Sequence, residues 1–160
     1  MKAYIGIDPG KTGAIAVVTR EEAEVYDWPG DEVSLARLLA LIDLDYNVVQ
    51  VRIEKQGARP GQGVCSMFSI GVNYGMLLAA CASRSWSVEI ISTRKWREGR
   101  GYPQKSARVP RNIYTRRLKE HSLTTAKRFF PKLADQLSRQ KDHGRAEALL
   151  IAYSAMESAK

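Results

Sequence analysis

The chain has 160 residues, 44% of them apolar, which is typical of one globular domain with its own core. Uninterrupted apolar stretches fall short of the roughly 20 residues of a membrane-spanning helix, so we expect no membrane partner. The formal net charge of +8 at pH 7 favours a polyanionic partner and argues against an acidic one.

The N-terminal residues predict strands at 3–8, 13–19 and 23–28, with tight-turn residues between the first two. One lysine precedes the first strand, so we expect no secretory signal and a cytoplasmic location. The two cysteines, Cys65 and Cys81, form no metal or redox motif, and we expect them to be free thiols in a reducing compartment.

The middle of the chain predicts alternating helices and strands. Asp31 is a suitable helix N-cap, and it is followed at helical spacing by Leu35, Leu38, Leu39 and Ile42. A buried strand at 48–54 ends in a carboxylate, and a Gly- and Pro-containing loop at 57–64 follows it.

A long helix is expected from Cys65 to Ser83. On it, Gly71 and Gly75 lie four residues apart on one face, which fits either internal packing or a dimer contact. A fifth strand is expected at 87–91. Strands followed by alternating strands and helices predict an α/β fold with a mixed sheet, in a single domain spanning 1–160.

The basic residues are concentrated in one segment, at about 94–119. It contains ten Lys and Arg and one acid, Glu98, a balance of +9 that leaves −1 for the rest of the chain. The basic residues are Arg94, Lys95, Arg97, Arg100, Lys105, Arg108, Arg111, Arg116, Arg117 and Lys119. Aromatic residues interleave them, as in segments that combine phosphate contact with base stacking. A DNA-binding segment is one interpretation, and a solvated charge run is the other.

The basic segment is expected to be irregular, because glycine and proline recur in it. After it, Ser122 is expected to cap a helix that runs through Phe130 and stops at Pro131. A final helix is expected from about Asp142 to Ser158.

Acidic residues occur in three elements that could converge. Asp8 lies in the first strand, Glu54 ends the fourth, and His143 and Glu147 share a face of the last helix because they are four residues apart. Asp142 lies off that face and could cap the helix. Several oxygen ligands in one place are what hard divalent cations require, so the set predicts a Mg²⁺ or Mn²⁺ site.

Each of these residues also has an ordinary structural explanation when taken alone. Asp8 could stabilise the turn that follows it, and Glu54 could pair with Lys55 or Arg52. His143 could be a surface or capping residue. The metal-site interpretation depends on the combination.

These residues resemble the RuvC family of Holliday-junction resolvases, in the retroviral-integrase/RNase H-like superfamily. The resemblance spans nearly the whole chain and is carried by IGIDPGKTGAIAV at 5–17, VRIEKQ at 51–56, MFSIGVNYG at 67–75 and DHGRAEALLIA at 142–152. It implies an RNase H-like fold, a mixed five-stranded sheet flanked by helices. It also implies a homodimer whose two sites make paired nicks in a four-way DNA junction.

The resemblance implies site residues as well. Asp8, Glu54, His143 and Glu147 would be the catalytic metal ligands, with Asp142 as a possible substitute for His143. About two Mg²⁺ or Mn²⁺ ions would be held in each site, as in other nucleases that hydrolyse phosphodiesters with two metals. The basic segment would hold the junction arms.

Two features depart from the bacterial members of that family. Gly57 stands where an aromatic residue often follows the second acid, and the basic segment is longer. The compact size and KEHSLTTAKRFFP at 119–131 look more like phage-encoded relatives.

Three other functions compete with this one. The first is an RNase H-like or general branched-DNA nuclease, and the second is a non-catalytic junction-binding module, favoured by His143 in place of an acid. The third is an actin-like or sugar-kinase ATPase, whose phosphate loop also begins with Gly-Ile-Asp-x-Gly. We discard the ATPase, because 160 residues cannot form its two lobes and no second phosphate motif is present.

Overall fold

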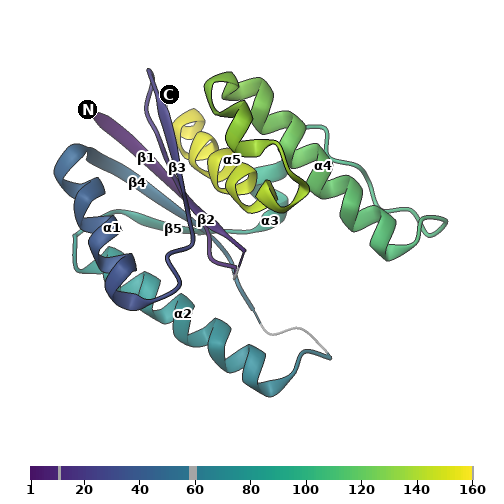
Figure 1. Cartoon of the computed structure of the whole chain (residues 1–160), viewed down its shortest axis with the longest axis horizontal. Helices are drawn as coiled ribbons and strands as arrows, with labels where there is room; N and C mark the ends of the chain where they lie inside the picture. The colour runs from purple at the N-terminus through teal and green to yellow at the C-terminus, as the bar shows by residue number, and fades with distance from the viewer. Residues whose placement is uncertain (11, 58–60, 160) are drawn as a thin grey trace.

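One mixed sheet of five strands organises the computed structural model, which describes residues 1–10, 12–57 and 61–159 (Figure 1). The strands are β1 (Lys2–Asp8), β2 (Ala14–Val18), β3 (Ala23–Asp27), β4 (Asn47–Glu54) and β5 (Val88–Ile91). Their order is β3-β2-β1-β4-β5, with β1, β4 and β5 parallel and β2 antiparallel to both neighbours. The α/β class and the five-stranded sheet predicted from the sequence are confirmed.

Helices cover both faces of the sheet (Figure 1). On one face lie α1 (Glu32–Asp45) and α2 (Val64–Ala82), which enclose a core that includes Ile5, Ile53 and Leu77. The predicted N-cap of α1 is confirmed, since the Asp31 carboxylate accepts a hydrogen bond from the Ser34 amide at 2.8 Å.

The opposite face carries α3 (Thr93–Arg97), α4 (Arg111–Phe129) and α5 (His143–Ser158). Two short 3₁₀ segments, η1 (Pro131–Leu137) and η2 (Gln140–Asp142), connect α4 to α5. Alternation along β1 sends Ile5 and Ile7 into the α1–α2 core and leaves Gly6 and Asp8 on the α5 face. The final helix, predicted from Asp142, is therefore the element that faces Asp8.

Two glycines allow α5 to pack against backbone. A Cβ on Gly6 would lie 2.2 Å from both the Ala148 carbonyl oxygen and the Ala152 nitrogen of α5. A Cβ on Gly144 would lie 2.1 Å from the Thr12 carbonyl oxygen in the β1–β2 turn. Because backbone atoms cannot rotate away as a side chain can, these contacts require glycine. They fix the first turns of α5 over the end of β1.

The basic segment is more regular than its glycines and prolines suggested. The structure places α3 at its start and the first half of α4 at its end, so the expected irregular chain is wrong for 94–97 and 111–119. Ser122 is fully buried in the middle of α4 and is not the predicted N-cap. The periodic signal was weak because the first half of α4 has few apolar residues, and all the buried residues of the helix lie in its second half.

The helix α2 is anchored to the sheet at its C-terminal end, through the fully buried Leu77 and Cys81. Both cysteines lie on α2 and are free thiols, as predicted. The opposite face exposes Val64, Phe68 and Val72. By length and hydropathy, α2 could also cross a membrane, which the sequence analysis did not anticipate, but one such helix is weak evidence.

Replacing Gly6 by alanine should destabilise the protein by about 3 kcal/mol, because α5 must move off β1 to admit the methyl group. The measurement is the free energy of unfolding in urea. The matched control is Gly57→Ala, since no described atom lies within 4 Å of a Cβ there. Equal stability of the two variants would contradict the backbone contact.

Candidate active site

Two carboxylates meet at one edge of the sheet because they end parallel neighbouring strands. Asp8 is the last residue of β1 and Glu54 is the last residue of β4, with Ile7 paired to Ile53 just before them. Neighbouring strands lie about 4.8 Å apart, and both acids are in phase with residues that face α5. The strand register therefore sets Asp8 beside Glu54.

Glu147 lies on the second turn of α5, the helix that packs on the sheet face carrying Asp8 and Glu54. It lies between the two glycine-permitted contacts, since Gly144 meets the β1–β2 turn and Ala148 meets Gly6. The three acids are close enough that the charges of Glu147 and Glu54 both raise the pKa of Asp8. The predicted convergence of Asp8, Glu54 and Glu147 is what the structure shows.

The three acids form a strongly unfavourable cluster when no cation neutralises them. Burial is the largest effect on Asp8, and with the charges of Glu147 and Glu54 it raises the pKa from 3.8 to about 7. The Gly10 amide donates a hydrogen bond to Asp8 at 3.3 Å and opposes this shift. Burial also raises the pKa of Glu147, against the charge of Arg97. Such a cluster favours a bound cation.

The side chain of Glu54 is held by the short helix α3. Thr93 Oγ1 donates a hydrogen bond to Glu54 Oε1 at 2.7 Å, and Trp96 Nε1 donates to the same oxygen at 2.9 Å. Thr93 and Trp96 are three residues apart, so one face of the helix presents both donors. The predicted pairing of Glu54 with Lys55 or Arg52 is not seen among the described residues: Glu54 accepts from Thr93 and Trp96, and Arg52 pairs with Glu89 at 2.7 Å.

Glu147 is held in the same way, by one residue of α3 and one of α4. Arg97 Nη2 donates to Glu147 Oε1 at 2.9 Å, and Ser122 Oγ donates to that oxygen at 3.0 Å. Tyr102 Oη lies 2.9 Å from Ser122 Oγ and extends the chain of hydroxyl groups. Burial raises the pKa of Tyr102 to about 12, so its phenol stays protonated.

Sequence reasoning missed Thr93, Trp96, Tyr102 and Ser122 as residues of this site. Thr93 lies beside the basic segment, and Trp96 and Tyr102 were interpreted as aromatic residues of that segment available for base stacking. Trp96 is fully buried, so that interpretation is wrong for it. Arg97 was assigned to DNA in that segment, and the structure places it against a carboxylate.

His143 and Asp142 are separated by the start of α5. His143 is half-buried and close enough to Glu147 for its charge to act on that carboxylate, and its Nδ1 lies 3.1 Å from the Gln140 carbonyl oxygen. Asp142 faces away and accepts hydrogen bonds from the Arg139 backbone and guanidinium. The structure therefore brings His143, and not Asp142, to the three acids.

The donor set suits a hard divalent cation. It offers carboxylate oxygens from three elements and one imidazole, in a half-buried site whose three negative charges are opposed by the one cation Arg97 among the described ion pairs. As the side chains are oriented, no three metal-ligating groups of the described residues are gathered around one point. The hydrogen bonds from α3 and α4 occupy one oxygen each of Glu54 and Glu147.

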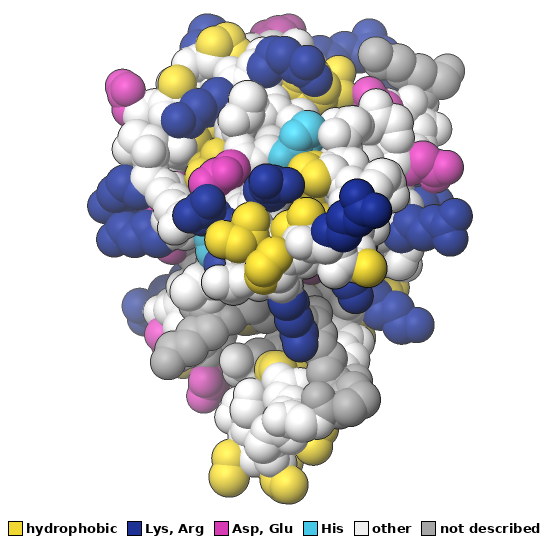
Figure 2. All heavy atoms as spheres, turned by 90° about the vertical axis from the view of Figure 1, so that its right-hand side faces the viewer, with side chains coloured by type: hydrophobic (Ala, Val, Ile, Leu, Met, Phe, Trp, Pro, Cys, Tyr) yellow, Lys and Arg dark blue, Asp and Glu magenta, His cyan; other side chains and the backbone are white. Residues whose placement is uncertain are grey.

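The ten basic residues predicted to bind DNA divide into two groups. Arg97 and Arg100 are turned inward, to Glu147 and Glu157. The others lie on or near the surface, where Lys95 pairs with Glu89 and Arg116 with Glu120. Figure 2 shows that Lys and Arg side chains predominate on the face beside α4, with only scattered acids.

A shallow groove of about 570 Å³ runs along the first half of α4. It is lined by Arg111, Asn112, Thr115, Arg116, Lys119 and Gln140. Gln140 is also the residue whose carbonyl oxygen lies beside His143. The groove therefore leads from the basic half of α4 toward the start of α5.

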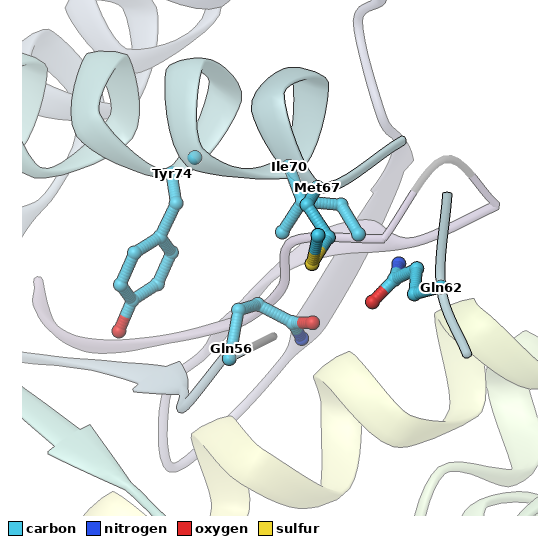
Figure 3. A pocket seen from close by; sticks show the side chains of 7 residues that line it. Gln56, Gln62, Met67, Ile70 and Tyr74 are labelled. Carbon is cyan, nitrogen blue, oxygen red and sulfur yellow. The ribbon is translucent and has the colours of Figure 1, made fainter. Parts of the chain in front are cut away.

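A smaller cavity of about 110 Å³ lies on the α2 side of the same sheet edge. Figure 3 shows Met67 and Ile70 reaching from α2 toward the amides of Gln56 and Gln62. None of the three acids lines it. The cavity belongs to the contact between α2 and the segment after β4, and the carboxylates face the other way.

Two solved structures of Thermus thermophilus RuvC have a similar fold. The chain matches Thermus thermophilus RuvC in complex with Holliday junction substrate, with a TM-score of 0.64 and 18% identity over 99% of this chain and 95% of that one. It matches the structure of Thermus thermophilus RuvC alone with a TM-score of 0.59 and 19% identity, over 98% and 95% of the two chains. The chain has the RuvC fold. No protein-family model and no curated protein matches it in sequence.

The RuvC fold confirms the RNase H-like sheet order and helices expected from the sequence. At 18% identity the likeness extends to the fold and leaves activity to be argued from the residues. The resemblance to phage-encoded relatives stays a prediction.

Asp8→Asn should stabilise the metal-free protein. Folded Asp8 keeps its proton up to about pH 7, whereas the unfolded side chain loses it near pH 3.8. The unfolded chain thus binds fewer protons between these values, and the free energy of unfolding falls as the pH rises through them. Asparagine avoids this loss, worth about 2–4 kcal/mol at pH 8.

Urea unfolding in EDTA, at several pH values from 4 to 8, measures this difference. The gain should shrink toward pH 4. Asp135→Asn, at an exposed carboxylate of η1, is the control and should change little. Wild-type stability of Asp8→Asn at pH 8 would contradict the crowded carboxylate site.

Proposed function

We propose that the chain is a divalent-metal-dependent endonuclease that resolves four-way DNA junctions by paired nicks. The observation that carries the proposal is the convergence of three half-buried carboxylates, Asp8, Glu54 and Glu147, at one sheet edge within a RuvC fold. The related fold has been seen with a Holliday junction, which supports this substrate class.

Asp8, Glu54, Glu147 and His143 would hold one or two Mg²⁺ or Mn²⁺ ions. Bound divalent ions would supply an activated water and charge stabilisation for the leaving oxygen of the phosphodiester. Asp8 lies between Glu54 on the next strand and Glu147 on α5, and the charges of both act on it. It is therefore the best placed to be shared between two ions.

The remaining residues of the site position these ligands. Thr93 and Trp96 orient Glu54, while Ser122 orients Glu147 and is itself hydrogen-bonded to Tyr102. Residues that orient metal ligands typically contribute 10–100-fold to metal affinity or activity. We assign α3 and the middle of α4 to this supporting role.

The basic groove on α4 would hold a junction arm. Arg111, Arg116 and Lys119 line it, and phosphate contacts by such residues fix a duplex without reading its sequence. The groove leads toward His143 and therefore toward the carboxylates. A bound arm could then present its backbone to the site.

A homodimer is the assembly that we propose, with α2 at the interface. Val64, Phe68 and Val72 lie at four-residue spacing and expose 77%, 73% and 43% of their surface. A Cβ on Gly71 or Gly75 would meet no described atom within 4 Å, so the internal packing considered for these glycines is absent from the described residues. Small residues on an apolar helix face allow another helix to approach closely.

Asp8→Asn and Glu54→Gln should keep junction affinity within about twofold and lower Mg²⁺-dependent cleavage by more than about 100-fold. Glutamine can still accept the hydrogen bonds of Thr93 and Trp96, so folding should be preserved. Labelled four-way junctions, forks, duplexes and RNA–DNA hybrids form the substrate panel, and Asp135→Asn is the control.

Symmetric nicks confined to the junction, lost in both variants and kept in the control, would support the proposal. Cleavage of forks and duplexes would indicate a general branched-DNA nuclease, and cleavage of the hybrid a ribonuclease. Tight junction binding without cleavage would indicate a non-catalytic module. Each of these three results would contradict the proposal.

The double variant Arg111→Gln, Arg116→Gln should weaken junction binding and its salt dependence. Each lost phosphate contact removes about 0.9 from the slope of log affinity against log salt. Fluorescence anisotropy in EDTA at several salt concentrations gives the slope. Arg145→Gln is the control, because Arg145 pairs with Asp27 outside the groove; an equal loss of slope there would count against the groove.

Val72→Asp should convert a dimer into a monomer, since it places a charge on the apolar face of α2. Light scattering with size-exclusion chromatography should give twice 17.9 kDa for the wild type. Leu44→Asp, on the exposed side of α1, is the control and should stay dimeric. A monomeric wild type, or dissociation of both variants alike, would refute this interface.

A further inference from the structure

We propose that Arg97 is a phosphate-binding residue that the DNA-free protein holds on Glu147, and that it couples metal loading of Glu147 to DNA binding. The inference rests on the proposed function, since it assumes that Glu147 is a metal ligand. It adds a residue that switches between two partners within the site.

The position of Arg97 is well defined. Its guanidinium donates to Glu147 at 2.9 Å and lies 4.9 Å from the ring centre of Trp96 and 4.7 Å from that of Tyr102. The two side chains of the ion pair are 19% and 12% exposed. A cation held over two aromatic rings is retained at the site even when its ionic partner changes.

The guanidinium is only partly satisfied by Glu147. Arg97 Nε is buried and has no hydrogen-bond partner among the described residues. Leaving Glu147 would cost one hydrogen bond, and a phosphate would replace it with a two-pronged contact that suits the guanidinium fork. Glu147 would keep the hydrogen bond from Ser122.

The same geometry sets Arg97 against a metal ion. Arg97 and a divalent cation would compete for the negative charge of Glu147. Because both would lie beside the same carboxylate, their positive charges would repel each other. A DNA phosphate that draws Arg97 away leaves Glu147 open to a cation. Because coupling between two ligands is reciprocal, the metal-loaded protein should also bind DNA more tightly.

The first test measures Mn²⁺ binding to the DNA-free protein, by electron paramagnetic resonance of the unbound ion. Arg97→Gln should bind Mn²⁺ about tenfold more tightly than the wild type, and Arg97→Lys should be intermediate. Arg145→Gln is the control, because it removes an arginine of similar exposure that pairs with Asp27, outside the carboxylate site. Circular dichroism shows whether each variant is folded, and Arg97→Lys carries the test if Arg97→Gln is not.

The second test measures junction affinity in EDTA, where the metal plays no part. Glu147→Gln should tighten binding about tenfold, because it releases Arg97 to a phosphate. In the Arg97→Gln background the same change should gain less than about threefold. This double-mutant cycle separates the release of Arg97 from the simple loss of a negative charge.

Wild-type Mn²⁺ affinity in both Arg97 variants, or an equal gain from Glu147→Gln in both backgrounds, would overturn the role of Arg97 alone. If the wild type binds no Mn²⁺, or if Asp8→Asn leaves its binding intact, the proposed metal site fails and the inference falls with it.

Discussion

The close approach of α5 to β1 is the constraint on which the site depends. Gly6 and Gly144 let the helix lie on bare backbone, so that Glu147 comes down beside Asp8. A side chain at either position would lift the helix and leave a pair of strand-end carboxylates without the third. The energy for this arrangement comes from the apolar core on both sides of the sheet, since the carboxylates themselves repel each other.

Local donors make the crowded carboxylates tolerable in the metal-free protein. The short helix α3 supplies a hydroxyl group, an indole N–H and a guanidinium to two of the three acids, and α4 supplies a second hydroxyl. Among the described residues, Asp8 accepts a hydrogen bond only from the Gly10 backbone amide, and its pKa is raised. These hydrogen bonds allow the protein to fold around the three acids, although the described positive charge beside them is less than their negative charge. Such an imbalance is common at functional sites.

Much of the fold could be predicted because its signals are local. Apolar runs that end in a carboxylate marked β1 and β4, the spacing of Leu35, Leu39 and Ile42 marked α1, and Asp31 marked its cap. The acids could be grouped because Asp8 and Glu54 end predicted strands and Glu147 lies near the start of the predicted last helix. Ser122 and Trp96 could not be assigned to the site, because only tertiary packing brings them there. The first half of α4 was missed because it contains few apolar residues, so its sequence shows little helical periodicity.

Arg97 shows the limit of reading charge from composition. Within a run of basic residues it looked like its exposed neighbours, and only the turn of α3 directs it inward. For the basic residues of 94–119 that lie on the surface, DNA binding remains the prediction.

Anomalous diffraction from crystals grown with Mn²⁺ tests the central claim most directly. The account predicts manganese density bounded by Asp8, Glu54 and Glu147, which should be absent from Asp8→Asn crystals. Manganese bound only elsewhere on the protein, or density unchanged by Asp8→Asn, would contradict the assignment of this sheet edge as a metal centre.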